Sequence, residues 1–554
     1  MLHFTEFTRN TENTELFKTF EPKIKAYRDE LAKSILCEYK LPEELIPDCL
    51  GVDVTEIPLK ILSEKEQEIT DLSASVLVKK ISSGEFTSTE VFRAYAKRAT
   101  AAQQLTNCAM QLFIEEGLER AKFLDDYYVK TGKTIGPLHG LPISVKEHMN
   151  FKNKITTAGF ACWIENVTKK SALMTELLEE AGAVFYVRTT EPQTMMHLCS
   201  KNNITGFCLN PANTALTPGG SSSGEAAIAA MKGSAIGIGS DIGGSIRCPA
   251  AFCGVWGLKP TQKRLTLKQT TAPSFGVSEG VYPVCGPLAR CADDINLCMK
   301  TILDKKPWEK DATLVPMPWR DVTEPNIKNL TVAICMDDGV VKPTAPILRG
   351  LKFAREKLIA AGAKIVEWKP VDVIELVNAC YSMYNCDGCR DDSTILAMSG
   401  EPLCKLTKVA MTFGCGEKGL TVTESTRLKL IRDVHRNKYQ DIMRQNGIDF
   451  ILTPAYVSVA AKPETVHYWG YTCLWNLLDY PGIVFPTGLK CEPAIDIPDT
   501  NYIPRNEIEE YERSLYDNPE DFKGAPISLQ LIGRRWFEEE LVKAAKVIQA
   551  TIAA

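Results

Sequence analysis

Residues 217–261 read TPGGSSSGEAAIAAMKGSAIGIGSDIGGSIRCPAAFCGVWGLKPT and contain the densest run of glycine and small hydroxyl residues in this chain. Each of the two Gly-Gly pairs in this stretch precedes a serine, Ser221 or Ser245. Paired glycines let the backbone approach a ligand or adopt positive φ values where other residues would clash. Between the pairs, residues 225–231 predict a short helix and residues 235–238 a buried strand. We therefore expect Ser245 to lie at a junction between a strand and a helix.

The composition is that of an ordinary globular protein. The 554 residues are 45% hydrophobic and 24% charged, with a net charge of −5. Acidic and basic residues are interspersed, so we expect neither nucleic acid nor an anionic membrane as a partner. No run approaches the roughly 18 to 20 apolar residues of a transmembrane segment. The 19 cysteines lack regular spacing and we find no apolar signal segment, so we expect reduced thiols and a cytoplasmic location, with peripheral membrane attachment as the remaining option.

Apolar periodicity predicts an α/β protein. A helix over residues 171–182 leads into a strand over residues 183–187, and a strand, a helix and a strand follow one another within residues 330–368. Such alternation predicts a large mixed, mostly parallel twisted sheet covered by helices on both faces. We expect an N-terminal helical extension over residues 1–70, with one or two amphipathic helices interrupted near Pro22, and one catalytic domain over residues 71–554.

A serine nucleophile needs a base and donors for an oxyanion. Histidine is the usual base, and the six histidines are His3, His139, His148, His197, His435 and His467. The G-x-S-x-G match in the glycine-rich stretch centres on Ser222 and has no clear strand before it. A Ser-His-Asp triad with distant partners stays open at this point.

Lys146 is the alternative base. It ends the apolar segment LPISVK at 141–146, so its stem would be buried and its amine would point beyond the strand. Burial disfavours the charged form of a lysine and lowers its pKa from about 10.4 towards neutrality. For a lone lysine, a snorkelling or ion-paired side chain, for example with Glu147, is the commoner interpretation.

Two stretches together resemble the amidase signature family, whose hydrolases cleave carboxamides with a Ser-Ser-Lys triad. They are PLHGLPISVKEHMN at 137–150 and the whole of 217–261, with Lys146 lying 75 residues before Ser221 and Ser221 lying 24 before Ser245. Further similar segments are residues 192–195, 449–454, 476–481 and 524–530. The resemblance covers about residues 70–550 and is strongest to the branch that includes fungal acetamidase-like and animal fatty acid amide hydrolase-like enzymes.

The resemblance implies the amidase signature fold and a role for each central residue. Ser245 would be the acylated nucleophile, Ser221 the serine that bridges to the base, and Lys146 the base. A cis peptide bond is expected at Gly220–Ser221. The backbone N–H groups that would bind the oxyanion are those of Ile242, Gly243, Gly244 and Ser245.

Neighbouring residues have supporting roles under the same resemblance. Asp241 and Arg247 are expected to form a buried pair that fixes the nucleophile loop, and the Ser222 hydroxyl to bond to the backbone. Met195 would line the substrate pocket, although core packing is an equally common role for a methionine. The family usually reads GGSSGG where this chain has GGSSSG, so Ser223 replaces a glycine.

The expected activity is hydrolysis of a small-molecule carboxamide to a carboxylate and ammonia or an amine, without a cofactor or metal. Two alternatives stay open. One is an ammonia-generating amidotransferase subunit, which would need a partner chain, and the other is a non-catalytic amide-binding protein on the same fold. A homodimer is also possible.

The sequence leaves the acyl group open among acetamide-like, aryl and fatty amides. Residues 190–200, 270–285 and 375–480 are expected to shape the pocket. Four aromatic residues could line an acyl channel or belong to the core: Tyr381, Tyr384, Trp469 and Trp475.

Two further patterns carry little weight. The glycines of residues 237–243 resemble a dinucleotide fingerprint, but their spacing is one residue off. Cys386 and Cys389 form a C-x-x-C pair without a second pair at zinc spacing. We therefore expect neither nucleotide binding nor metal or redox chemistry at these positions.

Overall fold

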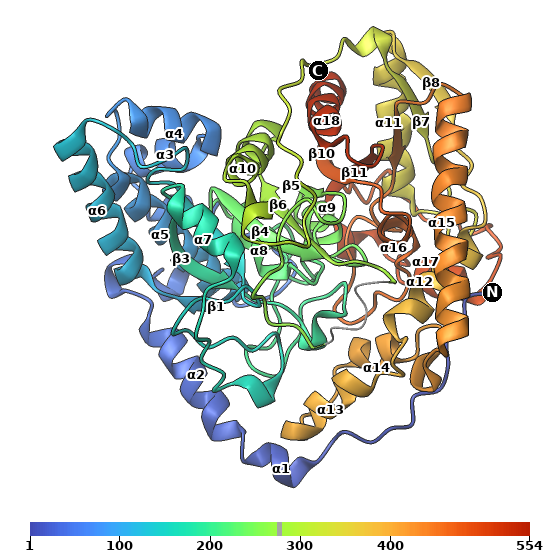
Figure 1. Cartoon of the computed structure of the whole chain (residues 1–554), viewed down its shortest axis with the longest axis horizontal. Coiled ribbons are helices and arrows are strands. Elements are labelled where there is room, and N and C mark those ends of the chain that lie inside the picture. The colour runs from blue at the N-terminus through green and yellow to red at the C-terminus, as the bar shows by residue number, and fades with distance from the viewer. Residues whose placement is uncertain (274–279) are drawn as a thin grey trace.

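The centre of the molecule is an 11-stranded sheet with strand order β1-β3-β2-β4-β6-β5-β10-β11-β9-β7-β8 (Figure 1). The computed structural model describes residues 1–273 and 280–554. The strands are β1 Ala109–Leu112, β2 Pro142–Lys146, β3 Val184–Thr189, β4 Ile236–Asp241, β5 Trp256–Lys259, β6 Val284–Ala289, β7 Thr331–Ile334, β8 Lys364–Glu367, β9 Phe450–Thr453, β10 Gly482–Lys490 and β11 Pro526–Ile532. This sheet confirms the predicted α/β class.

Eighteen α-helices surround the sheet in the part of the chain that the structure describes. They are α1 Thr14–Lys18, α2 Glu21–Lys33, α3 Glu64–Asp71, α4 Ala74–Ser82, α5 Ser88–Thr106, α6 Ile114–Thr131, α7 Leu173–Glu180, α8 Ser223–Ala230, α9 Arg247–Cys253, α10 Ala292–Asp304, α11 Ala345–Ala360, α12 Val373–Tyr384, α13 Arg390–Ser399, α14 Lys405–Met411, α15 Val422–Gln445, α16 Gly470–Leu477, α17 Glu507–Ser514 and α18 Glu538–Ala553.

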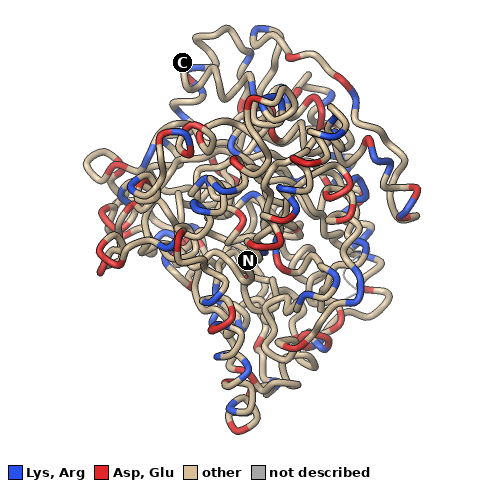
Figure 2. Tube along the Cα trace, turned by 90° about the vertical axis from the view of Figure 1, so that its left-hand side faces the viewer, with Lys and Arg blue, Asp and Glu red and all other residues tan. Residues whose placement is uncertain are grey.

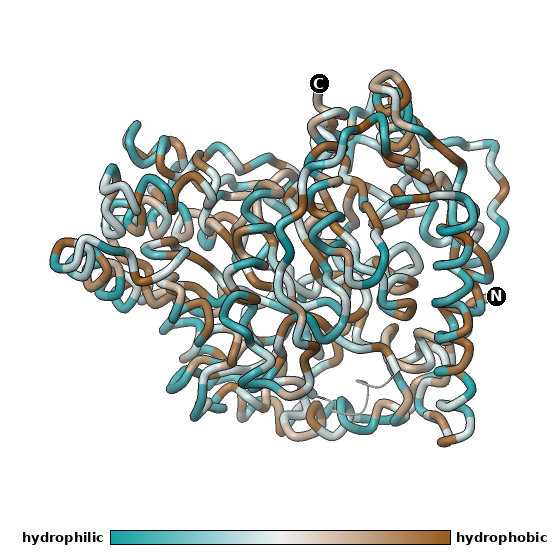
Figure 3. The backbone as a smooth tube through the Cα atoms, turned by 45° about the horizontal axis from the view of Figure 1, so that its top comes forward, coloured by the Kyte–Doolittle hydropathy of each residue, from teal (hydrophilic) through white to brown (hydrophobic). Residues whose placement is uncertain are grey.

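Helices cover both faces of the sheet. On β11, Ile527 lies against Gly350 of α11, whereas Gln530 accepts a hydrogen bond from Arg247 of α9. Because side chains alternate along a strand, residues three apart point to opposite faces, so α9 and α11 lie on different sides. Figure 3 shows hydrophobic segments mainly in the interior and hydrophilic residues on outer elements such as α15.

The strand directions differ from the prediction in one respect. Strands β3, β2 and β4 pair in parallel, as do β9, β7 and β8. The other six neighbouring pairs are antiparallel, so the sheet is mixed but not mostly parallel. Strands β5 and β6, and strands β10 and β11, follow one another along the chain and pair antiparallel. An apolar run reads the same in either direction, so the sequence pattern does not distinguish these cases.

The N-terminal residues run along the outside of the body. Helices α1 and α2 lie along its lower edge in Figure 1. The two helices separate at Thr19 and Phe20, and Pro22 lies in the first turn of α2 instead of interrupting a helix, because proline needs no N–H partner there.

The distribution of charged residues and the hydropathy of the helices are as expected from the sequence. Acidic and basic residues are interspersed along the trace (Figure 2). Among the described residues, no helix has the length and apolar character needed to cross a membrane.

Candidate active site

The carboxyl ends of two parallel neighbours, β2 and β4, position the candidate residues. Val145 of β2 pairs with Ile238 of β4, so Lys146 at the end of β2 lies beside the last residues of β4. The Lys146 Nζ atom lies 2.6 Å from Ser221 Oγ and 3.0 Å from Ser240 Oγ. The lysine side chain is completely buried. Residues 75 positions apart in the sequence thus form one hydrogen-bonded group.

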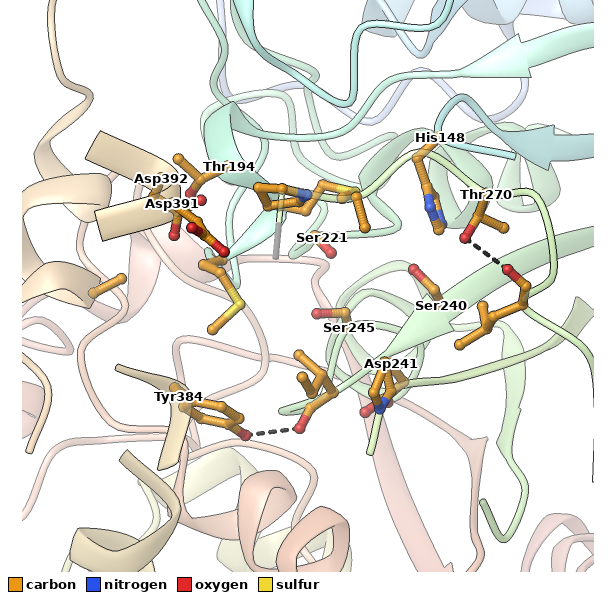
Figure 4. Close-up of a pocket in the computed structure, with 18 of the residues that line it drawn as sticks. His148, Thr194, Ser221, Ser240, Asp241, Ser245, Thr270, Tyr384, Asp391 and Asp392 are labelled. Carbon is orange, nitrogen blue, oxygen red and sulfur yellow. Dashed lines mark hydrogen bonds between the residues drawn. The ribbon is translucent and has the colours of Figure 1, made fainter. Parts of the chain in front are cut away.

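Ser221 and Ser245 come to the same cavity from the two Gly-Gly turns. Ser221 follows a cis peptide bond from Gly220, as expected, and precedes α8. Ser245 lies between β4 and α9, at the predicted junction of strand and helix. The Ser222 N–H donates to the Ser245 carbonyl over 3.0 Å and so joins the two turns. Both hydroxyls face a cavity of about 340 Å³ (Figure 4).

Burial sets the protonation of Lys146. It lowers the pKa of Lys146 from 10.5 to about 8, against the attraction of the carboxyl groups of Glu191, Asp241 and Glu225. Roughly a tenth of the amine is therefore uncharged at pH 7. An uncharged amine next to a serine hydroxyl can act as a proton acceptor.

The loop that carries Ser245 is held by a buried ion pair. Asp241 accepts hydrogen bonds from the N–H groups of Gly244 (2.8 Å) and Ile246 (3.1 Å) and pairs with Arg247 Nε at 3.0 Å. Burial alone would raise the pKa of Asp241, but the Arg247 guanidinium holds it below its usual range. The carboxylate therefore stays charged and fixes the shape of the loop.

Arg247 extends this network to two distant segments. Its guanidinium donates to Gln530 Oε1 over 2.7 Å and to Asn476 Oδ1 over 2.6 Å. Both residues belong to segments quoted above for the family resemblance. The network explains why those segments accompany the glycine-rich stretch.

The loop leaves three backbone donors free. The Gly244 N–H is already bonded to Asp241. Among the described residues, the N–H groups of Ile242, Gly243 and Ser245 have no hydrogen-bond acceptor. Of the four expected oxyanion donors, these three are available and Gly244 is not.

Two helices hold the carbonyl groups of this loop. Tyr384 of α12 donates its hydroxyl to the Ile242 carbonyl over 2.7 Å, and Thr472 of α16 donates to the Gly243 carbonyl over 2.6 Å. Gly244 has a φ of +129°, and a Cβ on it would lie 2.4 Å from Thr472 Oγ1. Glycine is required there for both conformation and space.

The predicted segments do converge on the cavity. Residues 190–200 contribute Thr194, Met195 and Met196. Residues 270–285 contribute five of the lining residues, while 274–279 lie outside the described part of the chain. The lining residues from 375–480 are Tyr384, Asn385, Asp387, Asp391, Asp392, Thr407, Ala410 and Met411.

Of the four aromatic residues left open by the sequence, Tyr384 lines the cavity. Tyr381 stacks on Phe413 with ring centroids 4.0 Å apart, and Trp469 meets Phe413 edge-on. Trp475 packs against Tyr439. These three belong to the core behind the cavity wall.

His148 and Ser240 line the cavity but were not predicted to do so. His148 is 4% exposed, and neither ring nitrogen has a hydrogen-bond partner in the described residues. His148 lies in the turn that follows β2, so strand periodicity does not predict its direction. Burial lowers the pKa of His148 well below its ordinary value, so the ring is neutral.

The geometry supports neither a histidine base nor Ser222 as the nucleophile. Within the described chain, no histidine hydrogen-bonds to Ser221 or Ser245. The Ser222 hydroxyl donates to the Ser240 carbonyl and accepts from the Ser240 N–H, each over 3.2 Å. It does not line the cavity, so the G-x-S-x-G match does not mark a nucleophile.

The fingerprint-like glycines have a packing role. A Cβ on Gly237 would lie 1.9 Å from Glu225 Oε2, and one on Gly239 would lie 2.6 Å from Ser222 Oγ. These glycines let α8 approach β4 closely. All 19 cysteines, including Cys386 and Cys389, are free thiols.

Comparison with known proteins agrees on one family. The family model described as Amidase matches residues 90–542. The chain is 42% identical over 503 residues to a protein of Schizosaccharomyces pombe named as an amidase, covering 90% of this chain and 93% of the relative. It is 36% identical over 535 residues to the acetamidase of Emericella nidulans, covering 94% and 96%. A solved structure named fatty acid amide hydrolase superimposes with a TM-score of 0.95 at 47% identity, covering 98% of this chain and 97% of that one.

Proposed function

This chain belongs to the amidase family and is a hydrolase of amide C–N bonds, and we propose that it acts through an acyl-enzyme on Ser245, with Ser221 and Lys146 as its proton relay. The observation that carries this proposal is the 2.6 Å contact between Lys146 Nζ and Ser221 Oγ at a cavity that Ser245 also lines. A binding protein would not need a buried lysine of lowered pKa at this position.

Acylation follows from proton transfer along this row of groups. Uncharged Lys146 accepts the Ser221 proton, and Ser221 accepts the Ser245 proton as Ser245 Oγ attacks the amide carbonyl. The same relay then returns a proton to the amide nitrogen, the C–N bond breaks, and ammonia or an amine leaves. This protonation is necessary because an amide anion is too basic to depart.

The oxyanion that forms during attack is stabilised by backbone donors. The free N–H groups of Ile242, Gly243 and Ser245 support this role, and each such donor typically contributes about 3 kcal/mol. Water then attacks the acyl group on Ser245 while the relay accepts a proton from that water. The bond between the acyl carbon and Ser245 Oγ breaks, the relay returns the proton to Oγ, and the carboxylic acid leaves and ionises to a carboxylate.

The cavity favours a small-molecule carboxamide with an apolar acyl group. Met195, Met196, Met411 and Ala410 supply apolar contact area to its wall. Relatives include an enzyme named acetamidase and one named fatty acid amide hydrolase, so acyl length is the property to test.

Ammonia release from primary amides of two to twelve carbons by the purified chain tests the proposal. We expect activity from the chain alone, loss of activity in Ser245→Ala, and retention in Ser223→Ala. Ser223 is a matched control because its buried hydroxyl donates to the Cys199 carbonyl over 3.3 Å and does not line the cavity. Activity that appears only with a second subunit would instead favour the amidotransferase alternative.

A further inference from the structure

Glu191 is a buried carboxyl group beside the candidate base for which the proposed mechanism has no use. It lies two residues after β3 and is 0% exposed. Neither Oε atom has a hydrogen-bond partner in the described residues, and Oε2 lies 4.0 Å from Lys146 Nζ. An ionised carboxylate in such a place would lack the partners that compensate for lost hydration. The charge state of Glu191 therefore needs an explanation.

The separation between the two groups is too long for a charged pair. Hydrogen bonds between an ammonium and a carboxylate measure about 2.7 to 2.9 Å, and a buried ion pair is favourable only with such geometry and with further hydrogen bonds. Lys146 Nζ approaches Ser221 and Ser240 instead, at 2.6 and 3.0 Å. The two groups therefore do not form a hydrogen-bonded ion pair.

Several titratable or charged groups surround Glu191 and Lys146. The titratable or charged groups that face the pair come from α2, from β2 and the residues after it, and from β3, α8 and β4: Tyr27, Glu147, His148, Arg188, Glu225 and Asp241. Asp241 is paired with Arg247.

Glu147 differs from Glu191 in its hydrogen bonds. Its two oxygens accept the N–H groups of Thr157 (2.6 Å) and Ala158 (3.0 Å), the arrangement expected of a carboxylate. The permanently charged guanidinium of Arg188 donates to the carbonyls of Glu147 and Met149 and to Thr156 Oγ1, not to either carboxyl group. Among the described residues, the cation within 4.0 Å of a Glu191 oxygen is Lys146.

Two further facts agree with a proton on Glu191. Burial raises the pKa of Glu191 well above its ordinary value, and the neighbouring Glu147 acts in the same direction. Burial also raises the pKa of Glu225 to about 8, with its oxygens accepting the hydroxyls of Thr189 and Ser144. Glu225 is thus a second buried carboxyl group of raised pKa near Lys146.

We propose that Glu191 is a positioning residue that holds a proton, fills the space beside the Lys146 amine and thereby favours the uncharged form of that amine and excludes water from it. This inference rests on the proposed role of Lys146 as the base. An ionised Glu191 would attract the ammonium form and remove the base from the relay, and a smaller side chain would admit water with the same effect.

Infrared difference spectra of the full-length protein at pH 7.5 test the proton directly. We expect the wild-type minus Glu191→Gln spectrum to contain the carbonyl band of a protonated carboxyl group. Glu509→Gln is the matched control, because Glu509 is equally buried but paired with Arg505 at 2.6 Å, and its spectrum should show only carboxylate bands. Carboxylate bands in the Glu191→Gln difference would overturn the proposal.

The pH dependence of kcat/KM tests the effect on Lys146. Glu191→Ala should shift the acidic limb upward by about one pH unit or more, which lowers kcat/KM at pH 7 about tenfold. Glu191→Gln, which is neutral and of similar size, should return the midpoint to its wild-type position. An unshifted limb in Glu191→Ala, or a limb moved to lower pH in Glu191→Gln, would contradict the proposal. Because the infrared result does not depend on catalysis, a failure of the proposed function would be recognised separately.

Discussion

The activity should depend on pH through Lys146, with an acidic limb near pH 8. The amine must be uncharged to accept a proton, so activity is present above its pKa and is lost as the pH falls below it. With a pKa of about 8, roughly a tenth of the amine is uncharged at pH 7. At the ordinary value of 10.5 the fraction would be roughly 0.03%. Burial therefore increases the active fraction about 300-fold, which corresponds to about 3 kcal/mol.

Replacing Lys146 by methionine removes the amine while keeping an apolar stem in the buried site. We expect kcat/KM for a good amide substrate to fall by about 10² to 10⁴ and the acidic limb near pH 8 to disappear. The assay is kcat/KM from pH 6 to pH 10, with a thermal melt of each variant.

Lys259→Met is the matched control for this experiment. Lys259 is also buried, at 1% exposure, and burial lowers its pKa to about 8 as well. Its amine donates to the Pro260 carbonyl, however, and does not line the cavity. The control should keep the limb at its wild-type position. A limb that survives in Lys146→Met, or a loss of less than tenfold there, would refute Lys146 as the base.

The loop around the nucleophile yields three more predictions. Asp241→Asn should lower the free energy of unfolding in denaturant melts by about 3 to 5 kcal/mol, because it leaves Arg247 buried without its charged partner; a loss below about 1 kcal/mol would contradict the network. Tyr384→Phe should lower kcat about fivefold with KM nearly unchanged, since one hydrogen bond to a loop carbonyl is lost; a change confined to KM would argue for a substrate contact instead. Gly244→Ala should lower kcat at least about tenfold, as its new Cβ would meet Thr472 in a strained backbone; unchanged steady-state kinetics would show that the loop adapts.

Local sequence patterns were sufficient to locate the two serine turns and the lysine strand. Glycine pairs, a short helix and an apolar strand are encoded by neighbouring residues, so the junction at Ser245 could be predicted. The cis bond at Gly220–Ser221 was expected from the family resemblance alone. That Lys146 lies beside Ser221 followed from the family resemblance, and it reflects the parallel pairing of β2 with β4.

Features that depend on distant contacts could not be predicted from the sequence. The Gly244 N–H donates to Asp241 and is therefore not available to an oxyanion. The glycine pairs in the sequence do not reveal this hydrogen bond. Glu191 contacts Lys146 only because β2 and β3 are neighbours in the sheet. Tyr384 is one of several aromatic residues in its region, and only the packing of α12 selects it for the cavity.

The most direct test of the account is the site of covalent labelling by a fluorophosphonate. Peptide mass spectrometry of the labelled protein should place the adduct on Ser245, and Ser245→Ala should not be labelled. Lys146→Met should be labelled much more slowly at the same serine, because the nucleophile lacks its relay. An adduct on Ser221, Ser222 or another residue, or persistent labelling of Ser245→Ala, would contradict Ser245 as the nucleophile.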